Sequence, residues 1–346
     1  MIRICSSLAA AGYAVTLAGT KNSRSAPLTQ MPYRQKRMSA FFTKGFGFYA
    51  VSNTRLFFYL LFAKYDAVCS IDLDTILPVW LASKLRNKKR IFDAHEYFSQ
   101  QKEVISRPQV YRFWHWVERK MLPRFPRGYT VSQSIADEFS RLYAVKYGVI
   151  RNMPLLKNPI SRSATQERII LYQGAVNEAR GLEWLIPAMK MVDAPLHIYG
   201  DGNFMEQTKK LIAANNLGDK LLVKGKILPA VLDQVTASAY IGINLVENTG
   251  LNQYYSLANK FFDYIHHGIP QLSMNFPEYK RINDKFEVAL LMDELTSSAI
   301  AAELNRLLSD ENLYHRLQQH CNEAKQVLNW QEEEKKLTAF YKSVFE

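Results

Sequence analysis

The chain has 346 residues, of which 48% are hydrophobic, and this is enough for two domains of roughly 150–200 residues with a core each. Its three cysteines lie far apart in the sequence, so they argue against a disulfide framework or a zinc motif and suit a reducing, cytoplasmic compartment. The net charge of +12 admits an anionic membrane surface or a phosphate-bearing substrate as partner, whereas the dispersed basic residues form no nucleic-acid-binding motif.

The chain opens with a helix and not with a strand. Met1–Gly12 has apolar residues at helical spacing, and the strand Ala14–Ala18 follows it. A doubly wound domain normally opens with a strand and a glycine-containing turn. We therefore expect the N-terminal sheet to lack its first strand, together with any contribution of that turn to an acceptor site.

Basic, glycine and aromatic residues fill Thr20–Asn53, which has little clear periodicity. Both a membrane-facing surface and a chance cluster on a soluble surface fit this composition. A helix around Leu56–Lys64 follows. Its apolar run Leu56–Ala63 is too short for a membrane span, which needs about 20 residues, and no signal peptide precedes it.

Strands and helices alternate through the rest of both halves, and this alternation predicts two doubly wound α/β domains with parallel sheets. The expected strands are Ala67–Ile71, Arg90–Ala94, Tyr129–Val131, Gly148–Arg151, Ile169–Gln173, Leu196–Tyr199, Leu221–Lys224, Ile241–Leu245 and Gln271–Met274. The expected helices are Thr75–Arg86, Gln109–Leu122, Ser134–Leu142 with Ser132 as its cap, Leu182–Met189, Met205–Asn215, Pro229–Ser238, Thr296–Leu308, Glu311–Val327 and Gln331–Phe345.

Polar residues follow two strands of the first half. Asp72 and Asp74 come after one strand, and Asp93, His95 and Glu96 end the next. Ligands of open α/β sheets bind at the carboxyl ends of strands, so these positions are candidates for a site. The Asp-Leu-Asp spacing imitates a metal-binding motif, but Asp74 is well placed to cap the helix that follows, and we favour the cap.

The stretch before the strand Gln271–Met274 reads as a helix with distinct ends. Ser256 is the expected N-cap, Gly268 fits the left-handed C-terminal position and Pro270 forbids continuation. Lys260 and Asp263 lie one turn apart on its polar face. A cation for phosphate and a carboxylate for a ribose diol would form a nucleotide-diphosphate cradle, although an ordinary amphipathic helix with a solvated Lys and Asp fits the periodicity as well.

The motif Ser-Leu-x-Asn-Lys-Phe-Phe-Asp-Tyr-x-x-x-Gly-x-Pro of Ser256–Pro270 resembles the donor-binding segment of retaining, family-four-type (group 1) glycosyltransferases of the GT-B fold. The resemblance implies that Ser256, Asn259 and Lys260 bind the donor. It also implies that Asp263 replaces the glutamate that holds the ribose, and that Tyr255 stands where a second glutamate contacts the sugar.

Further matches extend the resemblance over both halves. Gly174–Gly181 is similar to the family's phosphate loop, with Ala175 in place of Arg and Arg180 in place of Lys. Because guanidinium donates two parallel hydrogen bonds to phosphate, Arg180 suits a diphosphate. Gly202 corresponds to a glycine turn of the family, and Ile227 lies where the family meets the nucleotide base.

The resemblance also assigns the catalytic candidates of the first half. His95 matches a histidine that lies between the donor sugar and the acceptor, and Asp93 and Glu96 flank it. The family uses no metal at this position and needs no cofactor beyond the nucleotide-diphosphate sugar. The basic and aromatic loops of its first domain often face a membrane or a lipid-linked acceptor, so we expect peripheral contact with an anionic membrane.

The expected organisation is an acceptor-side domain 1–152, a linker 153–163, a nucleotide-sugar-binding domain 164–328 and a terminal helix 329–346 that crosses back to the first domain. The expected function is sugar transfer from a nucleotide-diphosphate sugar to a glycan or lipid-linked acceptor, with retention, in cell-surface polysaccharide biosynthesis. A nucleotide-sugar epimerase of the same fold and a catalytically impaired sugar-nucleotide-binding protein remain alternatives.

Overall fold

The computed structural model describes residues 1–22, 25–40, 42, 45–157 and 167–346. These residues form two compact units, one of Met1–Arg151 with Glu332–Glu346 and one of Asn152–Gln331. The units therefore divide at 151/152 and 331/332. The expected linker 153–163 lies outside the described residues from position 158 onwards.

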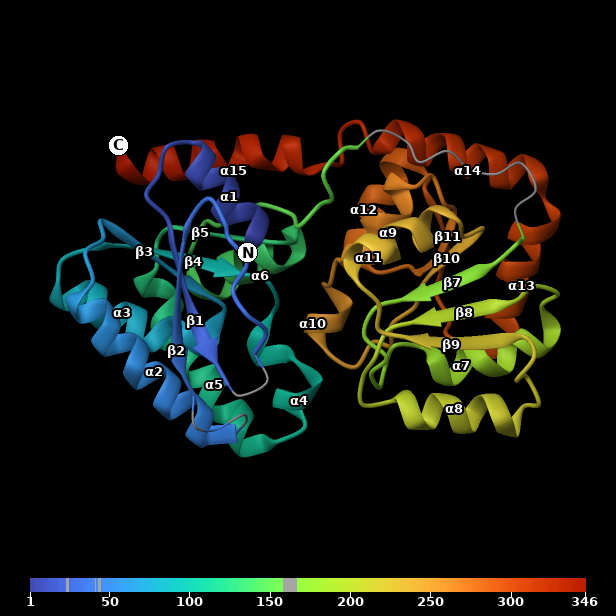
Figure 1. Cartoon of the computed structure of the whole chain (residues 1–346), viewed down its shortest axis with the longest axis horizontal. Helices are drawn as coiled ribbons and strands as arrows, with labels where there is room; N and C mark the ends of the chain where they lie inside the picture. Colours follow the sequence, from blue (N-terminus) through green and yellow to red (C-terminus); the bar gives the residue numbers. More distant parts are fainter. Residues whose placement is uncertain (23–24, 41, 43–44, 158–166) are drawn as a thin grey trace. The chain divides into compact units, whose positions relative to one another are not determined.

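The first unit begins with a helix and holds two parallel sheets among its described residues (Figure 1). A two-stranded sheet pairs β1 (Thr16–Lys21) with β2 (Arg34–Ser39), and a four-stranded sheet has the order β3-β4-β5-β6. The strands of the larger sheet are β3 (Ala67–Ile71), β4 (Lys89–Ala94), β5 (Gly128–Thr130) and β6 (Gly148–Val149). The helices are α1 (Ile2–Ala10), α2 (Gly45–Phe62), α3 (Ile76–Leu85), α4 (Lys102–Ile105), α5 (Pro108–Met121) and α6 (Gln133–Tyr143).

Two elements lie in the segment for which the sequence predicted no regular structure. Strand β2 reads Arg-Gln-Lys-Arg-Met-Ser and has no fully buried residue, so it lacks an apolar signature. Helix α2 starts eleven positions before Leu56, at Gly45, and only Leu60 of its 18 residues is buried. A helix that is apolar nearly all round has no single stripe by which its start can be recognised.

The predicted cap of α3 is wrong. Asp74 lies inside a short 3₁₀ turn, Leu73–Thr75, and α3 begins at Ile76 with no side-chain cap. The hydroxyl of Thr75 instead donates to the carbonyl of Ile71 at 2.9 Å. In contrast, Ser132 caps α6 as predicted, because its hydroxyl accepts the N–H of Ile135 at 3.3 Å.

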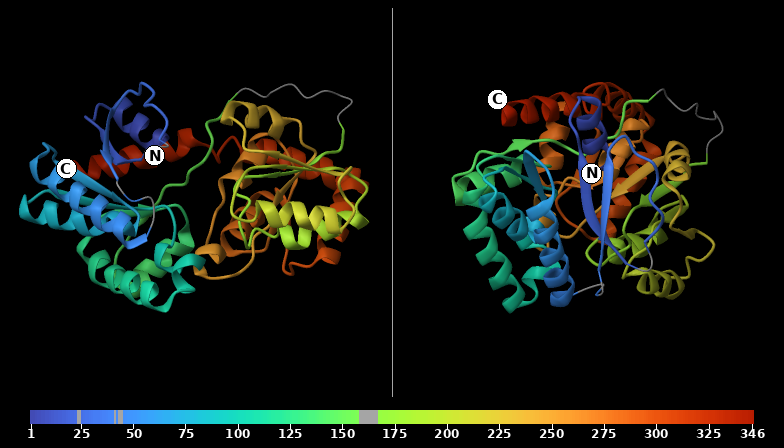
Figure 2. Two further views of the ribbon diagram at one scale, coloured as in Figure 1. Left: turned by 60° about the horizontal axis from the view of Figure 1, so that its bottom comes forward. Right: turned by 60° about the vertical axis from the view of Figure 1, so that its left-hand side comes forward.

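The last helix, α15 (Trp330–Phe345), packs its C-terminal end on the first unit, as Figures 1 and 2 show. Lys89 and Arg127 each donate to the carbonyl of Val344 at 2.7 Å. Cations at this end of a helix satisfy free carbonyls and oppose the negative end of the dipole. Among the described residues, no helix has the length and apolar composition that crossing a membrane requires.

The second unit is built on a six-stranded parallel sheet with the order β12-β11-β10-β7-β8-β9. Its strands are β7 (Ile170–Gln173), β8 (Leu196–Tyr199), β9 (Leu221–Gly225), β10 (Ile241–Asn244), β11 (Gln271–Met274) and β12 (Ala289–Met292). Its helices are α7 (Leu182–Ala188), α8 (Met205–Ala214), α9 (Pro229–Ala237), α10 (Leu251–Tyr254), α11 (Asn259–His266), α12 (Pro277–Phe286), α13 (Ser297–Ser309) and α14 (Glu311–Ala324). The strand order reverses between β7 and β10, which makes their carboxyl ends the topological switch point where ligands of such sheets bind.

The predicted cap of the donor-motif helix is also wrong. Helix α11 begins at Asn259 after Ala258, and no side chain caps it. The hydroxyl of Ser256 donates to the carbonyl of Gln253 at 2.8 Å, because the preceding residues form the short helix α10 that the sequence did not predict. At the other end, Gly268 has the expected left-handed φ of 61°.

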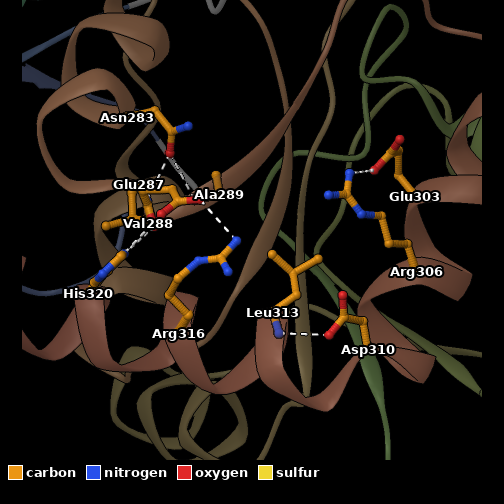
Figure 3. A network of polar contacts seen from close by, with 10 residues as sticks. All are labelled: Asn283, Glu287, Val288, Ala289, Glu303, Arg306, Asp310, Leu313, Arg316 and His320. Atoms are coloured by element: carbon orange, nitrogen blue, oxygen red, sulfur yellow. Dashed lines mark hydrogen bonds and ion pairs between the residues drawn. The ribbon is translucent and has the colours of Figure 1, made fainter.

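A polar network fixes the unpredicted pair α12 and β12 onto α14 (Figure 3). The side-chain carbonyl of Asn283 accepts the N–H groups of Val288 and Ala289 at 2.8 and 2.9 Å. Glu287, at a left-handed φ of 49°, pairs with Arg316 at 3.3 Å and with His320 at 3.4 Å, both on α14. Strand β12 is therefore held by the turn that precedes it as well as by its backbone pairing with β11.

Candidate functional site

Two loops meet at the switch point of the second unit. Residues 174–181 follow β7, residues 245–258 follow β10, and the N–H of Glu247 donates to the carbonyl of Ala179 at 3.0 Å. Gly181 has a φ of +73°, and a Cβ there would lie 2.8 Å from the Cβ of Leu245. Only glycine therefore allows the two loops to approach this closely.

Glycines also bring the loop after β8 against the loop after β7. A Cβ at Gly202 would lie 2.2 Å from the side-chain oxygen of Asn177 and 2.3 Å from the carbonyl of Val176. The N–H of Gly174, at a φ of +118°, donates to the carbonyl of Tyr199 at 3.0 Å. Gly174 and Gly202, both expected at the donor site, thus shape adjoining loops at the carboxyl ends of β7 and β8.

Two cations lie together at the end of β7. The ammonium of Lys260, in the first turn of α11, sits 4.1 Å from the ring centroid of Tyr172 on β7. Burial and the nearby charge of Arg180 lower the pKa of Lys260 to about 7. Within the described parts of the chain, neither cation has a carboxylate partner. The site therefore holds positive charge that a bound anion would neutralise.

Asp263 faces β7 from the next turn of α11. Its carboxylate accepts from the side-chain amide of Gln173 at 3.1 Å, and the hydroxyl of Thr236 donates to the carbonyl oxygen of that amide at 2.7 Å. A carboxylate only accepts hydrogen bonds, so the nitrogen of the Gln173 amide faces Asp263 and the amide oxygen faces Thr236. Lys260 and Asp263 thus lie beside neighbouring residues of one strand.

The remaining donor candidates occupy the rim of the same strand ends. Asn259, exposed at the first position of α11, accepts from the side-chain amide of Asn152 at 3.0 Å. Ser256 and Tyr255 follow α10 and are partly buried. Ile227, also partly buried, follows β9, two strands away from the switch point.

The catalytic candidates Asp93, His95 and Glu96 belong to the first unit, at the end of β4. His95 places its Nε2 3.2 Å from Oδ2 of Asp93, and its backbone N–H donates to the carboxylate of Asp72 at 2.8 Å. Burial acts to lower the pKa of His95, but the hydrogen bond and charge of Asp93 outweigh it and raise that pKa above its ordinary value.

Acidic groups gather around this histidine. Burial raises the pKa of Asp72 to about 8 and that of Asp74 to about 6, and the charge of Glu96 acts in the same direction on both. Asp72 also holds a left-handed φ of 53°, and strained backbone of this kind is frequent at functional sites. Among the described residues, no group of three His, Cys, Asp or Glu side chains is arranged to hold a metal ion.

Sequence reasoning missed three residues that hold the candidates in place. Tyr172 supports Lys260, Gln173 binds Asp263, and Tyr129 on β5 donates to Oδ2 of Asp93 at 3.0 Å. All three are strand residues with buried side chains, which pattern reading assigns to the core. The sequence signal that could have identified them is their position at or near the carboxyl end of a predicted strand, where candidate site residues also lie.

Two sequence families match the chain. "Glycosyltransferase Family 4" matches residues 1–153, and "Glycosyl transferases group 1" matches residues 157–324, so both halves are accounted for. No curated protein sequence matches it.

Several solved structures are similar to the chain. Sucrose-phosphate synthase from Thermosynechococcus elongatus has a TM-score of 0.84 at 19% identity, over 99% of this chain and 92% of that one. HepE of Anabaena in complex with UDP has a TM-score of 0.73 at 13% identity, over 90% of this chain and 87% of HepE. WaaG, a glycosyltransferase involved in lipopolysaccharide biosynthesis, has a TM-score of 0.74 at 13% identity, over 97% of this chain and 93% of WaaG. At such identities the similarity establishes the fold, and it confirms the predicted pair of Rossmann-like domains.

The buried charge of Lys260 should lower the stability of the free protein. Replacing Lys260 by Met should raise the free energy of unfolding at pH 7 by about 1–3 kcal/mol, because it removes a charge that burial disfavours. The folded pKa of about 7 lies below the ordinary value of 10.5, so the unfolded chain binds the proton more tightly between these pH values. Wild-type stability should therefore rise relative to the variant as the pH rises from 7 towards 10.

Urea unfolding followed by circular dichroism measures this difference at each pH. Lys210→Met, an exposed lysine on α8, is the matched control and should show no such trend. A Lys260→Met protein that is less stable than wild type at every pH would contradict the desolvation of Lys260.

Proposed function

The chain belongs to the group 1 glycosyltransferases of the GT-B fold, and from this premise we propose that it transfers a sugar from a nucleotide-diphosphate sugar to a glycan or lipid-linked acceptor. We propose further that the transfer retains the anomeric configuration, needs no metal, and serves the biosynthesis of a cell-surface polysaccharide. The enzyme uses no cofactor beyond its donor substrate in this proposal.

The pair of cations at the end of β7 carries the proposal. Lys260 is held in a partly buried position beside Arg180 at an energetic cost, since burial and the charge of Arg180 both disfavour its protonated form. A diphosphate bound there would neutralise both, and Arg180 can make bidentate contacts to it. The free backbone N–H groups at the start of α11 add hydrogen-bond donors, which also favour a bound anion.

The diol of the nucleotide ribose is the proposed ligand of Asp263. The carboxylate of Asp263 lies in the second turn of α11 and accepts a hydrogen bond from the side-chain amide of Gln173. A carboxylate has several acceptor positions, which suits the hydroxyl groups of a diol. Gly174, Gly202 and Ile227 would then line the path of the pyrophosphate and the base at neighbouring strand ends. HepE was solved with UDP, and uridine diphosphate is for this reason the first nucleotide to test.

The proposed mechanism relies on positioning and charge stabilisation. As the bond from the anomeric carbon to the diphosphate breaks, Arg180, Lys260 and the N-terminus of α11 stabilise the negative charge that develops on the β-phosphate. The acceptor hydroxyl attacks on the face that the diphosphate leaves and passes its proton to a phosphate oxygen. His95 orients the donor sugar and the acceptor, and Asp93 and Glu96 shape the charge around it.

We also propose that the enzyme acts at the cytoplasmic face of a membrane through α2. Phe58 and Phe62 lie one turn apart on this helix, and Phe62 and Phe46 are 79% and 84% exposed. Aromatic side chains on an exposed face and the net charge of +12 favour binding to an anionic bilayer.

The membrane proposal predicts that a Phe58→Ser, Phe62→Ser double variant binds vesicles with anionic lipid about fivefold more weakly or worse, because less apolar area enters the interface. Co-sedimentation with vesicles measures the binding. Leu228→Ser, which changes an apolar residue 72% exposed on the second unit, serves as control and should leave binding unchanged. Equal binding by the double variant and the wild type would rule out α2 as the contact.

The donor site predicts a pH-dependent affinity for UDP. Bound diphosphate should restore the proton on Lys260, so affinity should fall as the pH rises from 7 to 9 in the wild type. Lys260→Met should lower the affinity by about tenfold or more at pH 7 and remove most of this pH dependence. Calorimetric titration measures both effects, with Lys210→Met as control. Unchanged affinity in Lys260→Met would refute the phosphate role of Lys260.

The mechanism predicts that His95→Ala lowers turnover by about 10²-fold or more while the affinity for UDP stays the same. Steady-state kinetics and calorimetry separate the two quantities. NMR of the product decides the stereochemistry, since an inverted linkage excludes front-face transfer and makes His95, backed by Asp93, or Glu96 a conventional general base. Release of a free epimer without acceptor would instead identify an epimerase, and binding without turnover a binding protein.

A further inference from the structure

We infer that Tyr129 is a positioning residue that acts through Asp93 on His95. This inference rests on the proposed function, in which His95 acts on the substrates. Tyr129 belongs neither to the donor motif nor to the group of Asp93, His95 and Glu96, and it lies 34 positions after His95 in the sequence.

The strand register brings the three side chains together. Asp93 on β4 and Tyr129 on β5 are paired residues of the parallel ladder, so their side chains leave the same face of the sheet. Oδ2 of Asp93 lies 3.0 Å from the hydroxyl of Tyr129 and 3.2 Å from Nε2 of His95. One carboxylate oxygen is therefore shared between the phenol and the imidazole.

Burial separates the roles of the three residues. Asp93 and Tyr129 are each 1% exposed, whereas the side chain of His95 is 26% exposed. Neither Asp93 nor Tyr129 can touch a substrate from such positions. Any effect that they have on the reaction must pass through the imidazole of His95.

The arrangement selects one tautomer of His95. An ionised carboxylate only accepts hydrogen bonds, so Nε2 of His95 carries the proton that faces Asp93, and Nδ1 of the neutral ring is an acceptor. The phenol of Tyr129 donates to the same carboxylate and stabilises its ionised form. This donation matters because the second oxygen of Asp93, Oδ1, has no hydrogen-bond partner in the part of the chain that the structure describes.

Helix α15 holds the phenol of Tyr129 in place. The ring of Tyr129 meets Phe340 edge-on at a centroid distance of 5.2 Å and lies 6.4 Å from the ring of Tyr341. Lys89 and Arg127 anchor the C-terminal end of this helix to the unit. These contacts use the ring, so a phenylalanine at position 129 keeps the packing. It loses the hydroxyl, which besides Asp93 meets the hydroxyl of Tyr341 and the thiol of Cys69.

Removal of the hydroxyl should change the titration of His95 in a defined direction. The charged groups that face His95 are Asp93 on β4, Asp72 after β3 and the amino group of Met1. Without the phenol, Oδ2 of Asp93 keeps only the hydrogen bond to His95, and this undivided bond favours the protonated imidazole. The pKa of His95 should therefore rise.

The experiment compares Tyr129→Phe with Tyr147→Phe in the whole chain. Tyr147 is the matched control, because its buried hydroxyl donates to the carbonyl of Phe125 at 2.8 Å and not to Asp93. NMR of isotope-labelled histidine follows the titration of His95, which the His95→Ala spectrum assigns. We expect Tyr129→Phe to raise the pKa of His95 by about half a unit or more and Tyr147→Phe to leave it unchanged.

Two further measurements separate positioning from a merely structural role. In Tyr129→Phe the acidic limb of the pH dependence of kcat should move upward with the pKa of His95, while the affinity for UDP stays the same. A fluorinated tyrosine at position 129 is a stronger donor and should move the pKa of His95 downward. This second substitution keeps the inference testable should Tyr129→Phe fail to fold.

An unchanged His95 titration in both Tyr129 variants would overturn the inference, whether or not the protein transfers sugar. A shifted titration in a protein with no transferase activity would instead leave the contact between Tyr129 and Asp93 intact and refute the proposed function. The titration is measured without substrate, so the two failures remain distinguishable.

Discussion

The donor site that we propose in the second unit depends on one electrostatic constraint, the retention of Lys260 next to Arg180 at the end of β7. A lysine in such a place loses hydration and gains the repulsion of a second cation, and its pKa falls to about 7. The ring of Tyr172 compensates in part, because an ammonium 4.1 Å from an aromatic centroid is attracted by the ring. The arrangement remains unfavourable for the free protein. The loops around it approach each other closely only because Gly181 and Gly202 carry no Cβ.

The sequence was sufficient to predict the sheet of each unit for a physical reason. Interior strands of parallel sheets are buried on both faces, so they appear as short apolar runs with polar ends, and β8 and β11 of the six-stranded sheet were predicted with the bounds that the structure has. The bounds of β3, the apolar edge strand of the four-stranded sheet, were also predicted correctly. Strand β2 and the first eleven residues of helix α2 were not predicted, because neither has the alternation or the apolar stripe of a half-buried element. The capping errors at Asp74 and Ser256 arose because short helical turns precede α3 and α11, and a cap can be assigned only when the first residue of the helix is known.

The candidate site could be predicted only as far as its outward-facing residues. Lys260, Asp263 and Arg180 belong to a spaced motif, whereas Tyr172, Gln173 and Tyr129 are read from sequence as core residues. The hydrophobic pattern treats a buried tyrosine as apolar, although its hydroxyl must still find a partner. The partner, and with it the role, becomes visible only when strand register places two distant segments side by side.

The two units use the same device at their strand ends. In each, a buried strand tyrosine contacts a charged residue, Tyr172 beneath Lys260 and Tyr129 beside Asp93, and fixes it more firmly than a loop could. The two cases differ in which part of the tyrosine acts: the ring face attracts the ammonium, while the hydroxyl donates to the carboxylate. This difference has a consequence for substitution. Phenylalanine at position 172 would preserve most of the attraction between ring and ammonium, and its cost would be the hydrogen bond from the Tyr172 hydroxyl to the carbonyl of Ala175 at 2.7 Å. Phenylalanine at position 129 would remove the donor to the charged residue itself, so the same substitution acts on the loop backbone at one strand end and on proton affinity at the other.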